Sequence, residues 1–234
     1  MTNGNKWDGW GVSEIGPSHI NMNIPNQDAY IVKKFAWGIV GVVCDGLGSK
    51  KHSHIGSKSL VNAIVQCAKI FDFKNKDINL FEPLLKSIWD INISPYEEHE
   101  TSTTLLFVIV KNKRIYIGRV GDGAIAIFGK NNILVEETKD TFTNFTTPFG
   151  RDEKIVWYIF DEDDIDNIIL CSDGISEDIQ KDKILDFFKG YVSNYKNMKS
   201  SKRIKDIKLW LKNWPVKGHS DDKTIVALVK GINE

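Results

Sequence analysis

The chain has few of the residues that mark secreted, zinc-thiolate or thiol redox proteins. Its 234 residues include three cysteines and six prolines. Cys44, Cys67 and Cys171 are widely spaced and form no Cys-x-x-Cys pair, which argues against zinc binding and thiol redox chemistry. Cys44 and Cys171 each lie near the end of an apolar run, where cysteine serves as a small apolar side chain. Reduced thiols of this kind indicate the cytoplasm.

Long apolar segments and an excess of one charge sign are also missing. The sequence has no run of about 18 apolar residues, the length that a membrane-spanning helix requires. Its first seven residues lack the apolar stretch of a signal peptide. The formal net charge is zero, so nothing attracts the chain generally to nucleic acid or anionic lipid. We therefore expect a cytoplasmic protein that binds neither nucleic acid nor membrane.

What is present is the composition of a globular protein, with 41% hydrophobic and 26% charged residues. No repeat or Pro/Ser-rich linker divides the chain, so residues 1–234 are expected to form a single domain. The segment 7–18 predicts a first strand followed by a Gly-Pro break. Alternating and continuous apolar runs predict further strands at 29–33, 35–44, 103–110, 114–120, 124–128, 155–160, 168–172 and 224–229. Apolar residues three or four apart predict helices at 55–70, 79–91, 175–188 and 200–211. The order favours an α+β fold with stacked antiparallel sheets and helices outside them.

Three of the strand-like runs end on Asp-Gly, at Asp45, Asp122 and Asp173. A buried strand holds such an aspartate rigidly at the rim of the core, and the following glycine permits a close backbone turn. Together with Asp28 and the Asp221-Asp222 pair, these carboxylates are suited to hard divalent cations. The alternative is a set of hairpin turns, since Asp-Gly is a favoured turn pair. Asp122-Gly123 fits that alternative best, because predicted strands flank it on both sides.

The motifs and their order resemble those of the metal-dependent type 2C protein Ser/Thr phosphatases, from about residue 13 to residue 229. The matching motifs are Asn26-Gln27-Asp28-Ala29, Val43-Cys44-Asp45-Gly46, Thr103-Thr104, Val120-Gly121-Asp122-Gly123, Cys171-Ser172-Asp173-Gly174 and Asp221-Asp222-Lys223-Thr224. The resemblance implies a central β-sandwich of two antiparallel sheets flanked by helices on both outer faces. It also implies hydrolysis of phosphoserine and phosphothreonine by a water activated at a binuclear Mg²⁺ or Mn²⁺ centre.

The resemblance also assigns roles to individual residues. Asp45 would bridge the two cations, the Gly46 carbonyl would bind one of them, and Asp173 and Asp221 would complete the site. Asp28 would be a direct or water-mediated ligand, and Asp122 would hold a third, weaker ion. Asp222 competes with Asp221 for the last ligand position, because the two are adjacent.

The sequence departs from the family pattern around the first motif. Asn23 stands where many members carry an arginine that clamps the substrate phosphate, and an asparagine gives no bidentate charged contact. Gln27 replaces an acidic residue, and Leu47 replaces a histidine found in some eukaryotic members. A smaller bacterial branch, with Gly-x-Ser-His before Gln-Asp, is closer to this chain. In that branch His19 would bind phosphate or transfer a proton, which makes it a candidate catalytic residue beside Asp45 and Asp173.

The preferred interpretation is thus a phosphatase that acts on phosphorylated proteins and, by analogy, opposes a cognate Ser/Thr kinase. The loss of arginine at Asn23 also allows a catalytically weak or inactive module that binds phosphoproteins. A third alternative is a two-metal hydrolase of small phosphoesters. Thr103 and Thr104 are interpreted as packing residues at a strand start, and His52 and His54 as solvated loop residues. The segment from Phe128 to Asp161, with Phe142 and Phe145, lies where the family has a flap beside the cleft.

Overall fold

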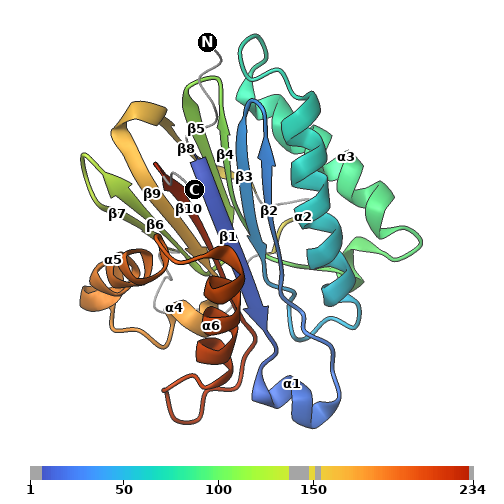
Figure 1. The fold of residues 1–234 in the computed structure, drawn as a ribbon. Helices are drawn as coiled ribbons and strands as arrows, with labels where there is room; N and C mark the ends of the chain where they lie inside the picture. Colours follow the sequence, from blue (N-terminus) through green and yellow to red (C-terminus); the bar gives the residue numbers. More distant parts are fainter. Residues whose placement is uncertain (1–6, 137–147, 151–153, 232–234) are drawn as a thin grey trace.

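Strands in the computed structural model form two five-stranded antiparallel sheets that pack face to face (Figure 1). The structure describes residues 7–136, 148–150 and 154–231. The strands are β1 Trp7–Glu14, β2 Ala29–Phe35, β3 Gly38–Cys44, β4 Leu105–Lys111, β5 Arg114–Val120, β6 Ala124–Gly129, β7 Ile133–Glu136, β8 Val156–Asp161, β9 Ile165–Cys171 and β10 Lys223–Lys230. The α-helices are α1 Pro17–Met22, α2 Ser53–Ile70, α3 Phe81–Ile93, α4 Asp173–Ser176, α5 Ile184–Tyr195 and α6 Ser200–Lys212.

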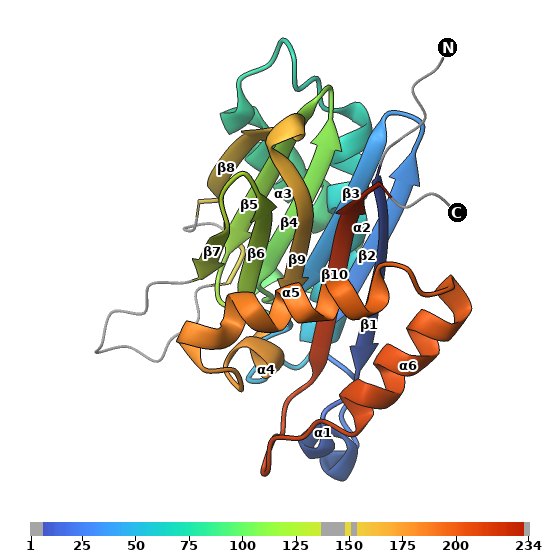
Figure 2. The same cartoon turned by 60° about the vertical axis from the view of Figure 1, so that its left-hand side comes forward.

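The chain changes sheets between β1 and β2, between β5 and β6, and on both sides of β8, whereas β2 to β5 are successive neighbours in one sheet. One sheet runs β1-β10-β9-β6-β7 and the other runs β2-β3-β4-β5-β8. Helices α2 and α3 cover the outer face of the second sheet, and α5 and α6 cover the outer face of the first (Figure 2). The predicted α+β fold, a β-sandwich flanked by helices on both outer faces, is therefore confirmed.

Three apolar layers hold the fold together. The layer between the sheets includes Val43, Val108 and Leu228, all at most 1% exposed. A second layer lies under α2 and α3, and a third lies under α5 and α6. Because helices or the facing sheet cover both sides of β3, every residue from Gly38 to Cys44 is buried, which explains its unbroken apolar sequence. Each fully buried large aliphatic side chain in these layers contributes about 1.5–3 kcal/mol relative to exposure.

The structure differs from several local predictions. The predicted helix at 175–188 is instead the one-turn α4, a 3₁₀ turn at Lys181–Lys183 and α5. The predicted strands 29–33 and 35–44 are joined at Ala36 and Trp37 rather than at Lys34, which lies within β2. Strand β7 and the short helix α1 were not predicted from the sequence. Asp122-Gly123 joins β5 to β6 across the two sheets, so the hairpin alternative is wrong for this pair.

No helix among the described residues is both long enough and apolar enough to span a bilayer.

Candidate metal centre

The predicted acidic residues meet at one end of the sandwich, where strands of both sheets begin or end. Asp45 follows β3, Asp122 follows β5, Asp173 begins α4 after β9, and Asp221 precedes β10. A cavity of about 200 Å³ at this end is lined by His19, Gln27, Asp45, Gly46, Leu47, Gly48, Thr104, Asp122, Asp173 and Asp221. Residues far apart in the sequence thus form one acidic site, as the motif order predicted.

Backbone and threonine hydrogen bonds fix the position of Asp45. Its N–H donates to Thr104 Oγ1 at 3.0 Å, and its carbonyl accepts from Thr104 N at 2.7 Å. Thr103 Oγ1 donates to the same carbonyl at 2.8 Å. The two threonines therefore anchor the backbone of Asp45, a role that the interpretation as packing residues missed. The two adjacent threonines at the start of the predicted strand were the sequence feature that could have indicated this role.

Gly46 is needed because the backbone approaches another segment closely. Its N–H donates to the Gln27 carbonyl at 3.2 Å. A Cβ atom at this position would lie 2.8 Å from Ser53 and 2.9 Å from the Gln27 carbonyl oxygen. The glycine thus lets the turn after β3 pass against the start of α2, which keeps the backbone at the cavity wall.

Asp28 lies beside the cavity rather than on its surface. The residue is 4% exposed, and its Oδ2 accepts a 2.8 Å hydrogen bond from the Ser172 hydroxyl. Its Oδ1 has no hydrogen-bond partner among the described residues. Burial, followed by the charges of Asp222 and Asp173, raises the pKa of Asp28 to about 8 against the opposing effect of two hydroxyl hydrogen bonds. A carboxylate in this setting is stabilised by a nearby cation.

Asp45 and Asp173 interact directly. Their carboxyl groups line the same cavity and repel each other when both are ionised. Burial, with the charges of Asp28 and Asp173, raises the pKa of Asp45 well above its usual value. Burial also raises the pKa of Asp173 to about 6. Divalent cations would offset the repulsion between these carboxylates, and this oxygen-rich donor set fits Mg²⁺ or Mn²⁺. Asp173 Oδ1, like Asp28 Oδ1, is buried without a hydrogen-bond partner in the described part of the chain.

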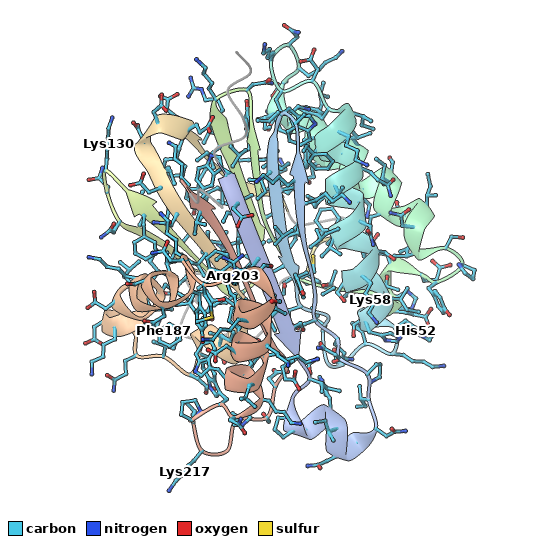
Figure 3. The ribbon with its side chains drawn as sticks, viewed as in Figure 1. His52, Lys58, Lys130, Phe187, Arg203 and Lys217 are labelled. Atoms are coloured by element: carbon cyan, nitrogen blue, oxygen red, sulfur yellow. The ribbon has the colours of Figure 1, made fainter. Side chains whose placement is uncertain are left out.

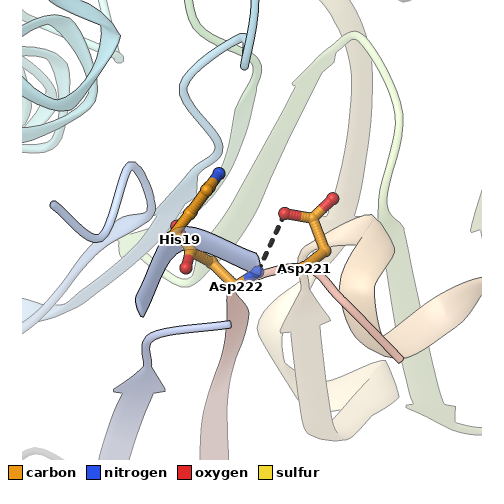
Figure 4. A group of neighbouring side chains, drawn as sticks. All are labelled: His19, Asp221 and Asp222. Carbon is orange, nitrogen blue, oxygen red and sulfur yellow. Dashed lines mark hydrogen bonds and ion pairs between the residues drawn. The ribbon is translucent and has the colours of Figure 1, made fainter. Parts of the chain in front are cut away.

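The two adjacent aspartates before β10 have different environments (Figure 4). Asp222 is 2% exposed, and its carboxylate accepts hydrogen bonds of 2.7 Å from both Gly16 N and Gln27 N. Asp221 lines the cavity, and its Oδ1 accepts from Asp222 N at 2.8 Å. Because Asp222 is occupied by backbone donors, the geometry favours Asp221 as the residue that faces a cation.

His19 lies at the cavity wall on α1, with its Nδ1 2.9 Å from Asp222 Oδ2. Asn23 does not line this cavity. It is the exposed C-cap residue of α1, in the left-handed conformation (φ 53°, ψ 39°) that asparagine tolerates well. Asn23 thus ends helix α1 and supplies no positively charged side chain to the site. The residue that α1 contributes to the cavity is His19.

The other loop residues singled out in the sequence lie elsewhere. The His52 ring lies beside the Tyr96 ring in a tilted arrangement, with centroids 4.4 Å apart. Neither His52 nor His54 lines the acidic cavity. Phe142 and Phe145 fall outside the described residues. Phe149 is 1% exposed and packs edge-on against Trp89, so it belongs to the core under α2 and α3.

Comparison with known proteins identifies the class. The model of the protein phosphatase 2C family matches residues 15–212, and the chain therefore belongs to this family. Membership of this family places the chain among the phosphoprotein phosphatases. These enzymes hydrolyse phosphate monoesters, and their catalysis in general depends on metal ions. No curated protein gives a significant sequence match.

Solved structures share the fold at low sequence identity. The catalytic domain of the Ser/Thr phosphatase PstP in complex with two manganese ions is 17% identical, with a TM-score of 0.66 over 97% of this chain and 99% of that chain. Stp1 from Staphylococcus aureus is 16% identical, with a TM-score of 0.68 over 100% of this chain and 98% of that chain. PppA of Pseudomonas aeruginosa, described as a regulatory component of a type VI secretion system, is 12% identical, with a TM-score of 0.63 over 97% and 98%.

Proposed function

We propose that this chain is an active protein phosphatase that removes phosphate from phosphoserine and phosphothreonine with two bound Mg²⁺ or Mn²⁺ ions. The convergence of Asp45, Asp173 and Asp221 on one cavity carries the proposal. An inactive relative would not need to keep these carboxylates together against their mutual repulsion.

In this proposal the carboxylates of Asp45, Asp173 and Asp221 and the carbonyl of Gly46 hold the cations. Asp28 supports the site from beneath Ser172, and Asp122 lies at the cavity wall where a third ion would bind. Bound cations would orient the phosphoryl group, lower the pKa of a water molecule and stabilise the leaving oxygen. The protein supplies rigidity, because both threonine hydroxyls and the turn at Gly46 fix the backbone around Asp45.

His19 is the candidate for contact with the substrate phosphate or the leaving oxygen. The residue is 9% exposed at the cavity wall, and Asp222 lies 2.9 Å from Nδ1. Because Nδ1 is buried beside Asp222 without the geometry of a hydrogen bond, Nε2 is the ring nitrogen left for the substrate in this proposal.

The test is steady-state hydrolysis of p-nitrophenyl phosphate and a phosphothreonine peptide with Mn²⁺, with Mg²⁺ and with EDTA. We expect turnover that requires metal and falls at least about 100-fold in Asp45→Asn and Asp173→Asn, because both variants weaken a ligand. The matched control is Asp166→Asn, an exposed aspartate on β9. Metal-independent turnover, or full activity in both variants, would refute the proposal.

A second candidate function is a phosphoprotein-binding module with weak or no catalysis. The observation in its favour is Asn23, which supplies no positive charge to the cavity. A folded, metal-loaded protein that binds a phosphopeptide without hydrolysing it would establish this alternative. Hydrolysis of nucleotides in preference to phosphopeptides would instead favour a small-molecule phosphoesterase.

The cellular role follows by analogy with the family. We propose a phosphorylated protein as substrate and a Ser/Thr kinase as the opposing enzyme in the cytoplasm. Phosphoproteomics of a deletion strain would test this role, since no phosphoprotein should accumulate if the role is wrong.

A further inference from the structure

A second cavity adjoins the acidic one and shares two of its lining residues. This neighbouring cavity also measures about 200 Å³, and Asp173 and Asp221 line both. The remaining lining residues come from α4 and the following turn and from the loop before β10, and are Gly174, Glu177, Asp178, Lys217, Gly218, His219, Ser220 and Lys223. A substrate whose phosphate lies at the acidic site would therefore place neighbouring groups in the second cavity.

The loop before β10 is held firmly in place. Ser220 O accepts a 3.1 Å hydrogen bond from Ser18 N. A Cβ atom at Gly16 would lie 2.3 Å from backbone atoms of Ser220 and Asp221, so only glycine permits this approach. On the other side, a Cβ atom at Gly174 would lie 2.1 Å from the Asp222 carbonyl oxygen. The loop thus presents its side chains from a fixed backbone.

A buried lysine sets the tautomer of His219. Lys223 is 2% exposed, and its ammonium donates to the Asp221 carbonyl at 2.9 Å. The same ammonium lies 3.1 Å from His219 Nδ1. An ammonium group has donors only, so Nδ1 must accept and the ring proton must sit on Nε2. His219 therefore offers a fixed N–H donor at the wall of the second cavity.

Two further side chains of this loop can donate hydrogen bonds. The Ser220 hydroxyl and the Lys217 ammonium make no side-chain hydrogen bond or ion pair with any described residue. Lys217 stands at the outer tip of the loop (Figure 3). Asp178 Oδ2 already accepts a 2.7 Å hydrogen bond from Trp214 Nε1, and its charge acts on His219 and Lys223. Glu177 is exposed. Cations held by Asp173 and Asp221 would offset the charges of the shared wall. With metal bound, the cavity then favours an anion on the side of the loop.

We propose that the cavity lined by Lys217, His219 and Ser220 is a substrate subsite that recognises an acidic side chain next to the phosphorylated residue. This inference rests on the proposed function, and it names a substrate class: phosphoproteins with Glu or Asp flanking phosphothreonine or phosphoserine. A carboxylate in the subsite accepts from His219 Nε2 and Ser220 Oγ, and Lys217 adds long-range attraction at the rim.

The test compares three phosphothreonine peptides that differ only in the residues flanking the phosphorylated one, which are Glu, Ala or Lys. With Mn²⁺, the wild-type protein is expected to favour the Glu peptide over the Ala peptide about tenfold in kcat/KM, mainly through KM. A hydrogen bond to a charged group has an effect of this size. His219→Ala should reduce the ratio to near one, and Lys217→Glu should reduce it severalfold. His219→Gln should restore part of the ratio, because the amide can accept from Lys223 and still donate. The matched control, Lys212→Ala, removes an exposed lysine at the end of α6 and should leave the ratio unchanged.

Binding measurements separate failure of this inference from failure of the proposed function. If no peptide is hydrolysed, fluorescence anisotropy of the labelled peptides with Mn²⁺ still measures the Glu-to-Ala ratio of affinities, and the same loss in His219→Ala is expected. A ratio of one in the wild-type protein would overturn the inference. So would a ratio that His219→Ala does not change. A preference for the Lys peptide would also overturn it, and would assign the cavity to Glu177 and Asp178.

Discussion

The Ser172 hydroxyl donates a 2.8 Å hydrogen bond to Asp28 Oδ2 and accepts one of 3.1 Å from Thr224 N. Ser172 follows β9, Asp28 precedes β2, and Thr224 lies in β10. One buried hydroxyl therefore connects strands of both sheets directly beneath the acidic cavity.

Replacing this hydroxyl should destabilise the protein. Ser172→Ala leaves the Thr224 N–H and an oxygen of Asp28 without their partner in a buried setting, at a cost of about 1–3 kcal/mol for each unsatisfied group. We expect the free energy of unfolding to fall by at least about 1 kcal/mol, measured by equilibrium urea denaturation in EDTA. Ser193→Ala, at an exposed position of α5, is the control. Equal losses in the two variants would show that the hydroxyl has no special role.

Metal binding should stabilise the fold. Cations that bind only the folded state add about 2.7 kcal/mol at 100 times Kd. For a chain of this length that corresponds to a rise in Tm of about 5–10 °C. We expect Mn²⁺ to give such a rise over EDTA in thermal denaturation. In Asp173→Asn the rise should be much smaller, because a ligand is lost. An equal rise in wild type and variant would place the metal elsewhere.

The stability of the metal-free protein should depend on pH through Asp28. Its pKa is about 8 in the folded protein, against 3.8 for an ordinary aspartate. The folded state therefore binds this proton more tightly, and its stabilising contribution is complete below pH 3.8 and is lost as the pH rises through 8. Asp28→Asn mimics the protonated group. We expect wild type and Asp28→Asn to differ little below about pH 4, and the variant to become progressively more stable than wild type as the pH rises toward 8.5.

Urea denaturation in EDTA at a series of pH values measures this difference. The exposed Asp166→Asn provides the baseline for a carboxylate outside the site. A difference between wild type and Asp28→Asn that stays constant with pH would contradict the raised pKa.

Two helical glycines should respond in opposite ways to the same substitution. A Cβ atom at Gly56 in α2 would lie 1.7 Å from the Thr101 carbonyl oxygen, whereas nothing lies within 4 Å of a Cβ atom at Gly190 in α5. Gly190→Ala should stabilise the protein by about 0.5–1 kcal/mol, because alanine favours the helix.

Gly56→Ala should instead destabilise by more than about 2 kcal/mol, because α2 must move away from the segment that leads to Thr103 and Thr104. Denaturation midpoints of the two variants give the comparison. Stabilisation by both substitutions would show that the contact at Gly56 is easily relaxed.

The sequence predicted the sandwich because the strands are buried on both faces and the helices have clear apolar stripes. Strand β5 was predicted at its observed bounds, since a turn at Asn112 and Lys113 and the polar Asp122 limit it on both sides. The 175–188 helix was wrong because the spacing of Ile175, Ile184 and Phe188 continues across a break that only the packing reveals. All three residues belong to the same apolar layer, although two helices carry them.

The sequence predicted which acidic residues meet at the site but not the buried contacts that hold them in place. The convergence of Asp45, Asp122, Asp173 and Asp221 was expected from motif order, and the structure brings them to one cavity. The buried role of Asp222 was not predictable, because the residues that donate to it, Gly16 and Gln27, lie about 200 positions earlier. Contacts of that kind depend on the completed fold, and no local pattern in the sequence encodes them.

The acidic cavity spans the seam of the sandwich. Asp45 extends from β3 in one sheet and Asp173 follows β9 in the other. An ion bound by both residues would cross-link the two sheets reversibly. Amide protons at this end of both sheets would then exchange more slowly with the ion bound than without it, and the two sheets would show this change together. The proposed metal centre would in this way also make this end of the fold more rigid.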